Sequence, residues 1–172
     1  MPDARRPRSR PRPPRAGRPA FPKDYGLSAR SRTGLLPWAW ARRRLVRAHN
    51  YWISTTRPDG RPHAMPIWGL WLDEAFLFST SRRSRKARNL RTRPQAVVHL
   101  ESGDQTVILE GRVREVRDPR VLARYADGYH AKYRFRPDPA DGANVTYALR
   151  ARVGFAWRER DFPDSATRWR LV

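Results

Sequence analysis

The sequence predicts a mainly β protein of the α+β class, in which six or seven antiparallel strands form a small closed or half-open barrel with helices around it. Short runs rich in β-branched and aromatic residues recur from residue 51 to the C-terminus. Turn sequences such as Asp59-Gly60 join successive runs directly, which favours hairpins. A chain of 172 residues suits one compact domain, and closing the sheet removes its exposed edges.

The first 32 residues differ in composition from the rest of the chain. They hold ten basic and two acidic residues, many prolines and almost no apolar side chains. Such a segment cannot bury enough apolar surface to offset the entropy of the chain. We therefore expect residues 1–32 to be a disordered Arg/Pro-rich tail and residues 33–172 to be the folded, cofactor-binding domain.

Three segments have helical spacing together with helix-start signals. The first lies in GLLPWAWARRRLVRA, with Pro37 in its first turn. The second spans residues 84–93 and the third spans residues 118–135. Ser84 and Asp118 begin these two helices, because short polar side chains cap free backbone N–H groups there.

The strands follow in chain order with short turns between them. Their expected ranges are 51–56, 63–72, 75–80, 95–102, 106–117, 144–159 and 166–171. Pro66 in the second range indicates a bulge or an edge position, since proline cannot donate a hydrogen bond to a neighbouring strand. Gly111 inside the long fifth range indicates a β-bulge.

The segment SRRSRKARNL, residues 81–90, contains five basic residues and no acidic one. Its helix cap places Arg85 and Lys86 in the first turn, where the positive end of the helix dipole disfavours cations. A bound anion would reverse this effect, and the preceding strand end adds the hydroxyls of Ser79 and Thr80. Taken alone, the segment has three interpretations: a phosphate site, a nucleic-acid contact or a solvated basic face.

Composition excludes several kinds of site. The net charge of +21, carried by 34 arginines and three lysines, raises nucleic acid as a partner, but no recognised binding motif accompanies it. There is no cysteine, and the four histidines have no metal-ligand spacing, so we expect no metal. No apolar run approaches the roughly 18 residues of a membrane span. Arg5-Arg6 precedes no apolar signal region, so we expect a soluble, cytoplasmic protein.

The string RPDGRPHAMPIWGLWLDEAFLFSTSRRSRKARNL, followed by a strand, a turn and VILEGRVREV, resembles the pyridoxamine 5'-phosphate oxidase-like superfamily. This superfamily has the FMN-binding split β-barrel fold. More narrowly, the chain is similar to the flavin/deazaflavin oxidoreductases of actinobacteria, over about residues 35–171. The resemblance implies a homodimer, with FMN or the deazaflavin coenzyme F420 bound in grooves at the dimer interface.

The resemblance also implies roles for individual residues. The phosphate end of the cofactor would contact Ser79, Thr80, Arg85 and Lys86, with Asn89 a weaker candidate. The local helix-start argument adds Ser84 to this cofactor site. The isoalloxazine-type ring would lie along Met65, Pro66, Ile67 and Trp68. Thr106 stands where the oxidase proper has a cofactor-contacting glutamine. That departure argues against oxidation of pyridoxamine phosphate itself.

The cofactor of such an enzyme carries the hydride chemistry, so no conventional catalytic triad is expected. We favour F420 over FMN because the subgroup resemblance points to it. Its phosphodiester and polyglutamate tail also form a longer anion, which the basic residues of 81–90 would complement. His130 and Tyr133, three apart on the third helix, are weak candidates for delivering a proton to an unsaturated small-molecule substrate.

Two other functions stay open at this point. In the first alternative, the protein is a carrier of flavin, F420 or haem without catalysis. In the second, it is a basic nucleic-acid-binding protein that uses the tail and the basic helix. A carrier would bind cofactor without turnover. A nucleic-acid-binding protein would show steeply salt-dependent binding that falls when residues 1–32 are removed. We rank the reductase first, the carrier second and nucleic-acid binding third.

Overall fold

The computed structural model describes residues 13–25, 31–138 and 140–171. The strands are β1 Ala16–Gly17, β2 Tyr51–Thr56, β3 Pro62–Ile67, β4 Leu70–Leu72, β5 Ala75–Ser81, β6 Gln95–Leu100, β7 Gln105–Glu115, β8 Asn144–Arg158 and β9 Thr167–Arg170. The α-helices are α1 Trp38–Arg47, α2 Arg85–Thr92 and α3 Pro119–Tyr133. Short 3-10 helices occur at Lys23–Tyr25 and Glu159–Asp161. None of the helices in these ranges has the length and apolar composition of a membrane span.

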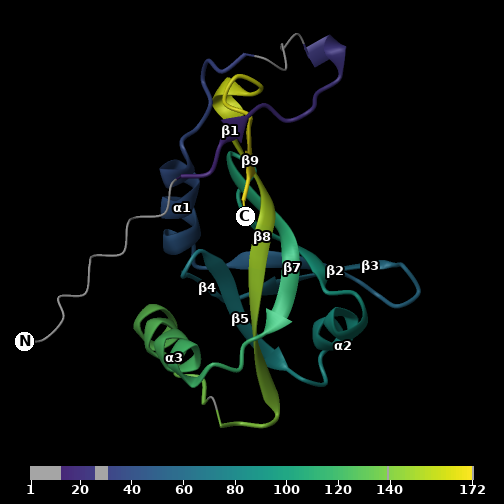
Figure 1. The fold of residues 1–172 in the computed structure, drawn as a ribbon, viewed down its shortest axis with the longest axis vertical. Coiled ribbons are helices and arrows are strands. Elements are labelled where there is room, and N and C mark those ends of the chain that lie inside the picture. Colours follow the sequence, from purple (N-terminus) through teal and green to yellow (C-terminus); the bar gives the residue numbers. More distant parts are fainter. Residues whose placement is uncertain (1–12, 26–30, 139, 172) are drawn as a thin grey trace, which may run out of the picture.

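The predicted fold class is confirmed. Every strand pair is antiparallel, and the sheet runs in the order β1-β9-β8-β7-β6-β2-β3 with helices around it (Figure 1). The long strand β8 pairs with β7 on one edge, and with β5 and β9 in turn on the other. Within the described residues no pairing joins β3 to β4, so the barrel is split rather than closed.

The predicted strand 63–72 is in fact two strands. β3 pairs with β2, whereas β4 pairs with β5, and the chain crosses between them at Trp68 and Gly69. A Cβ atom on Gly69 would lie 2.3 Å from the Phe76 ring, so the crossing requires a residue without a side chain. Pro66 lies on β3 in continuous register with β2, which confirms the edge position and not a bulge.

The bulge that we predicted at Gly111 is confirmed. The register of β7 on β8 shifts between Glu110 and Gly111, and Arg152 is the additional residue on β8. A Cβ atom on Gly111 would lie only 2.1 Å from the carbonyl oxygen of Arg150. Glycine at this position therefore allows the close approach of the two backbones that the bulge needs.

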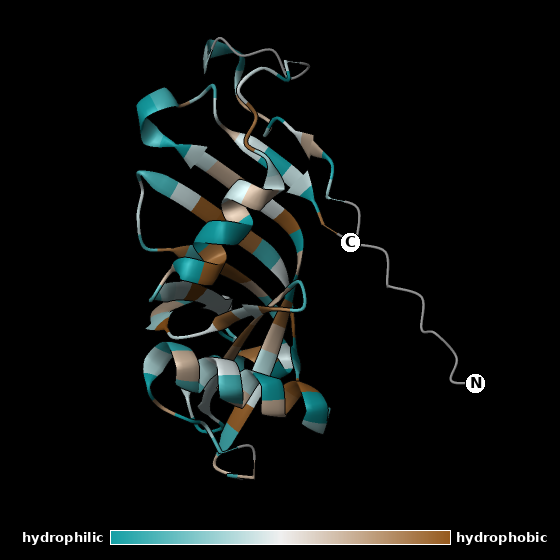
Figure 2. Ribbon diagram, turned by 90° about the vertical axis from the view of Figure 1, so that its left-hand side faces the viewer, coloured by the Kyte–Doolittle hydropathy of each residue, from teal (hydrophilic) through white to brown (hydrophobic). Residues whose placement is uncertain are grey.

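The main hydrophobic core lies on one face of the sheet. Alternate residues of β2 are buried, as its sequence pattern predicts, and apolar residues recur along the other strands (Figure 2). The largest side chains that are fully buried there are Trp169, Tyr51, Phe76, Phe78, Leu45 and Ile53. Each such burial stabilises the fold by about 1.5–3 kcal/mol before the chain entropy is counted. α1 and α2 close this core through Trp38, Trp40, Leu45, Ala87 and Leu90.

A second, smaller core holds α3 against β5. Tyr125, Tyr129 and Tyr133 of α3 pack on Ala75 and Leu77 of β5. The intervening residues of β5 belong to the main core, so this strand is covered on both faces. This packing places the C-terminal end of α3 beside the crossing between β3 and β4.

Part of the segment that we expected to be a disordered tail lies against the folded domain. β1 pairs with β9, and Arg18 follows β1 directly. The Arg18 guanidinium donates hydrogen bonds to the carbonyl oxygens of Ser31, Thr33, Pro163, Asp164 and Ala166. Composition did not predict this contact, because it rests largely on the hydrogen bonds of a single arginine. Residues 1–12 and 26–30 of the predicted tail lie outside the described residues.

Candidate functional site

The first turn of α2 and the end of β5 share a chain of polar contacts. Ser84 caps the helix, as predicted, and its hydroxyl accepts a hydrogen bond from the backbone N–H of Ala87 at 3.2 Å. The same hydroxyl accepts from Thr80 Oγ1 at 3.1 Å. Lys86 Nζ donates to Thr80 Oγ1 at 3.3 Å. The first turn contains no acidic residue.

This helix start fits an oxoanion. Within the described residues, the backbone N–H groups of Arg85 and Lys86 have no acceptor. Arg85 is exposed, whereas Lys86 is half-buried, and burial lowers the pKa of its ammonium group. Free N–H groups, the positive end of the helix dipole and an ammonium group therefore meet at one place, which is the arrangement that binds phosphate in other proteins.

Two residues that the sequence analysis did not assign belong to the same cluster. His63 on β3 lies with Nδ1 3.4 Å from Thr55 Oγ1. Burial lowers its pKa, and the positive charges of Arg57, Lys86 and Arg85 lower it further. The Nε of Arg57 is buried and has no hydrogen-bond partner in the described part of the chain. Both residues flank the first hairpin turn, so the motif that carried the family resemblance also contained them.

Ser79 and Asn89 make internal contacts. Ser79 Oγ lies 2.8 Å from Thr146 Oγ1 and so links β5 to β8. Asn89 is fully buried, and its Nδ2 donates to Thr55 Oγ1 at 2.9 Å. The structure therefore brings Thr80, Ser84, Arg85 and Lys86 together at the helix start, whereas these two predicted residues tie the helix and the strands to the core.

The four residues expected to line the ring do not share one face. Side chains alternate along β3, so Met65 and Ile67 project to one side and Pro66 to the other. Met65 is 43% exposed and Ile67 only 8% exposed. Trp68 follows the strand and is 44% exposed. Met65 and Trp68 are therefore the two large apolar side chains of this segment that a ligand can reach.

Thr106 lies at the other end of the β6–β7 hairpin from α2. Its hydroxyl donates to the carbonyl oxygen of Gly103 at 2.8 Å, and the residue is 7% exposed. Gln95, which follows α2 closely, pairs with Arg112 at the far end of β7. The structure does not bring Thr106 together with the helix start within one chain.

Tyr133 supports the crossing between β3 and β4. Its ring stacks on Trp68, with centroids 4.8 Å apart and 8° between the planes. Its hydroxyl accepts from the backbone N–H of Gly69 at 3.0 Å and lies 2.8 Å from the His49 carbonyl oxygen. Burial raises the Tyr133 pKa to about 12. His130 lies on the exposed side of α3, so the roles of His130 and Tyr133 in proton delivery stay predictions.

Lys132, between these two residues, is a titratable group that the sequence analysis did not select. Its Nζ donates to Tyr51 Oη at 2.8 Å and to the Gly69 carbonyl oxygen at 3.1 Å. Burial lowers its pKa to about 8. An ammonium group with a lowered pKa therefore lies directly behind the Trp68–Gly69 crossing.

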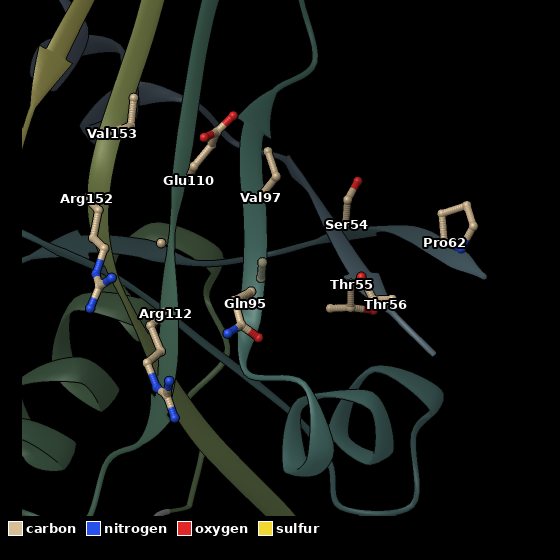
Figure 3. Close-up of a pocket in the computed structure, with 12 residues that line it drawn as sticks. Ser54, Thr55, Thr56, Pro62, Gln95, Val97, Glu110, Arg112, Arg152 and Val153 are labelled. Carbon is tan, nitrogen blue, oxygen red and sulfur yellow. The ribbon is translucent and has the colours of Figure 1, made fainter. Parts of the chain in front are cut away.

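A groove of about 480 Å³ crosses the outer face of the sheet, opposite the main core (Figure 3). Its lining residues include Ser54, Thr56, Val97 and Glu110, which alternate along their strands with buried core residues. In the described residues the buried aromatic and leucine side chains of the helices belong to the main core or to the core under α3. Half-buried apolar residues lie on this face at Trp52, Val97, Ile108, Val153 and Phe155.

The model of the pyridoxamine 5'-phosphate oxidase family matches residues 41–157 of this chain. A conserved hypothetical protein of Mycobacterium tuberculosis is 24% identical, with 76% of this chain and 89% of that chain covered and a TM-score of 0.66. An F420 reductase is 24% identical over 64% of this chain and 92% of that chain, with a TM-score of 0.52. An FMN-binding protein from Nostoc punctiforme is 17% identical over 72% of this chain and 81% of that chain, with a TM-score of 0.53. Haem-binding proteins also share this fold.

Proposed function

The chain belongs to the pyridoxamine 5'-phosphate oxidase family, and from that premise we propose that it is an oxidoreductase that binds coenzyme F420, with FMN as the alternative cofactor. The substrate would be an unsaturated small molecule. When bound, the cofactor supplies the hydride chemistry. The observation that carries the proposal is the start of α2, where Thr80, Ser84 and Lys86 meet beside two free backbone N–H groups with no acid among them.

The charges around this helix start favour an anionic ligand. Burial disfavours the charged forms of Lys86 and His63, and nearby cations disfavour the charged form of His63 further. A phosphate placed among these groups would relieve both effects, because each cation would gain a partner of opposite charge. Arg57 would contribute from the hairpin turn its buried Nε, which has no partner among the described residues.

Two arguments favour F420 over FMN. The sequence resembles the deazaflavin-dependent subgroup, and a protein described as an F420 reductase has the same fold. The anionic part of F420 extends well beyond one phosphate, and the surface of this chain is strongly basic, with a net charge of +21. Electrostatic attraction therefore supports the longer anion.

We also propose that the protein is a homodimer, as the family resemblance implies. The half-buried apolar residues on the outer face of the sheet support this, since no helix in the described residues buries them. A second copy packed on this face would cover those residues and enclose the groove between the two chains. The cofactor would then lie between protomers.

The experiment is a fluorescence titration of the protein with F420 and, separately, with FMN. We expect saturation near one cofactor per chain. Lys86→Ala should weaken binding at least about tenfold, because charged hydrogen bonds contribute about 1.5–3 kcal/mol. Lys23→Ala is the matched control, because Lys23 lies in the 3-10 helix near the N-terminus and should leave the affinity unchanged.

The outcomes separate the competing functions. Failure of both cofactors to bind would contradict the oxidoreductase proposal, and haem and single-stranded nucleic acid would then be titrated in the same way. Tight cofactor binding without turnover of any unsaturated acceptor would identify a carrier. Nucleic-acid binding that is steeply salt-dependent and falls on removal of residues 1–32 would identify the third function.

A further inference from the structure

Five arginines lie together on the outer face of the last three strands of the sheet. Arg112 is on β7 and stands directly opposite Arg150 on β8. Arg170 and Arg168 on β9 stand opposite the outward residues Val153 and Phe155. We call this set the arginine strip: Arg112, Arg150, Arg152, Arg168 and Arg170.

Within the described residues, the arginine strip forms no ion pair. Some arginines elsewhere pair with carboxylates, as Arg61 does with Asp59 and Arg124 with Asp73. In the described residues, no member of the strip makes an ion pair or a side-chain hydrogen bond to a carboxylate. Like charges directly opposite each other on neighbouring strands destabilise a sheet. The strip therefore lowers the stability of the sheet, and a bound anion would remove this repulsion.

The β-bulge places one member of the strip. Arg152 is the additional residue of β8, next to Gly111 on β7. Figure 3 shows the Arg152 and Arg112 side chains extending to the same side of the groove, with the Gln95 amide beside them and Glu110 extending the other way. Bulges commonly redirect side chains next to binding sites. The groove therefore has one end lined by two guanidinium groups and an amide.

We propose that the arginine strip is a second anion site, separate from the first turn of α2, and that it binds the carboxylate or phosphoryl groups of an extended anionic ligand lying in the groove. Planar guanidinium groups suit both kinds of oxoanion. Neighbouring strands are about 4.8 Å apart, so the strip spans about 10 Å across β7, β8 and β9 and accommodates more than one anionic group.

This inference rests on the proposed function and extends it, because it assigns the strip to the part of the cofactor beyond its first phosphate. FMN has a single phosphate and would not need the strip. The groove volume of about 480 Å³ falls in the range of small-molecule sites. This size favours a small oligoanion over nucleic acid as the occupant.

The test uses the double variant Arg112→Gln/Arg152→Gln in the full chain. The matched control is Arg61→Gln/Arg124→Gln, which removes the same charge from arginines that are already ion-paired. Calorimetric titrations use F420, FMN and inorganic tripolyphosphate. We expect the strip variant to lose at least about tenfold in affinity for F420 and for tripolyphosphate, and less than about twofold for FMN. The control should change none of the three.

The outcomes distinguish this inference from the proposed function. If Lys86→Ala weakens cofactor binding but the strip variant does not, the second anion site at the arginine strip is overturned and the oxidoreductase proposal stands. If the protein binds neither cofactor but loses tripolyphosphate binding in the strip variant, the anion site stands and the oxidoreductase proposal fails. If a single-stranded oligonucleotide binds more tightly than F420 and depends on the strip, the assignment to a small-molecule anion is overturned.

Discussion

At the residue scale, Tyr133 connects three parts of the chain that are distant in sequence. Its ring stacks on Trp68, and its hydroxyl contacts the backbone of Gly69 and of His49. The contact with the Gly69 N–H is buried, so no water replaces it if the hydroxyl is removed. Tyr133 thereby holds the exposed Trp68 ring in one place at the crossing between β3 and β4.

Substituting Tyr133→Phe should lower the free energy of unfolding by about 1–3 kcal/mol, because the buried N–H of Gly69 loses its acceptor while the ring stack is retained. Urea denaturation measures the change. Tyr129→Phe is the matched control, since Tyr129 packs on the same helix face without a side-chain hydrogen bond in the described residues. Equal losses of unfolding free energy in both variants would show that the hydrogen bond of the Tyr133 hydroxyl to Gly69 does not stabilise the fold.

At the element scale, the pairing of β7 with β8 depends on the bulge. The two strands pair along the whole of β7, and the register shifts once, between Glu110 and Gly111. This shift separates the part of β8 that pairs with β5 from the part that pairs with β9. The bulge therefore lies where β8 exchanges β5 for β9 as its second partner, and it also positions Arg152.

Substituting Gly111→Ala should destabilise the protein by about 1–3 kcal/mol or more, because the added Cβ would lie 2.1 Å from the Arg150 carbonyl oxygen and force the strands apart. Thermal and urea unfolding measure this effect. Gly103→Ala, in the turn that precedes β7, meets no atom within 4 Å and should change stability by less than about 0.5 kcal/mol. A wild-type stability for Gly111→Ala would contradict the bulge geometry.

At the scale of the whole molecule, the outer face of the sheet carries both the half-buried apolar residues and the arginine strip. A homodimer across this face would bury the apolar residues and bring two arginine strips close together. Like charges on the two copies would then repel each other unless anions lie between them. Dimer formation and anion binding are therefore expected to support each other.

Substituting Ile108→Glu should convert the proposed dimer to a monomer, because it would bury an unpaired carboxylate in the interface. Light scattering coupled to size-exclusion chromatography measures the mass, and circular dichroism checks that the fold is retained. Val46→Glu is the control, since Val46 is 47% exposed on α1, away from this face. A monomeric wild-type protein would contradict the homodimer proposal.

The candidate site was predictable in part. The Ser84 cap and the position of Lys86 beside Thr80 follow from short-range signals, and the structure places them as expected. Arg57 and His63 were not assigned, because their approach to Lys86 depends on how the first hairpin packs against α2. Asn89 lies in the predicted helix, yet its partner is Thr55, 34 positions away.

The sequence by itself determined most of the elements: alternation marked β2, capping residues marked the starts of α2 and α3, and glycine marked the bulge. These features depend on hydrogen bonds and sterics within a few residues. Only the tertiary structure decided which strand each half of residues 63–72 joins. It also decided that Lys132 reaches Tyr51 across 81 positions and that Arg18 reaches Ala166 across 148. Such contacts follow from strand order and register, which no local pattern encodes.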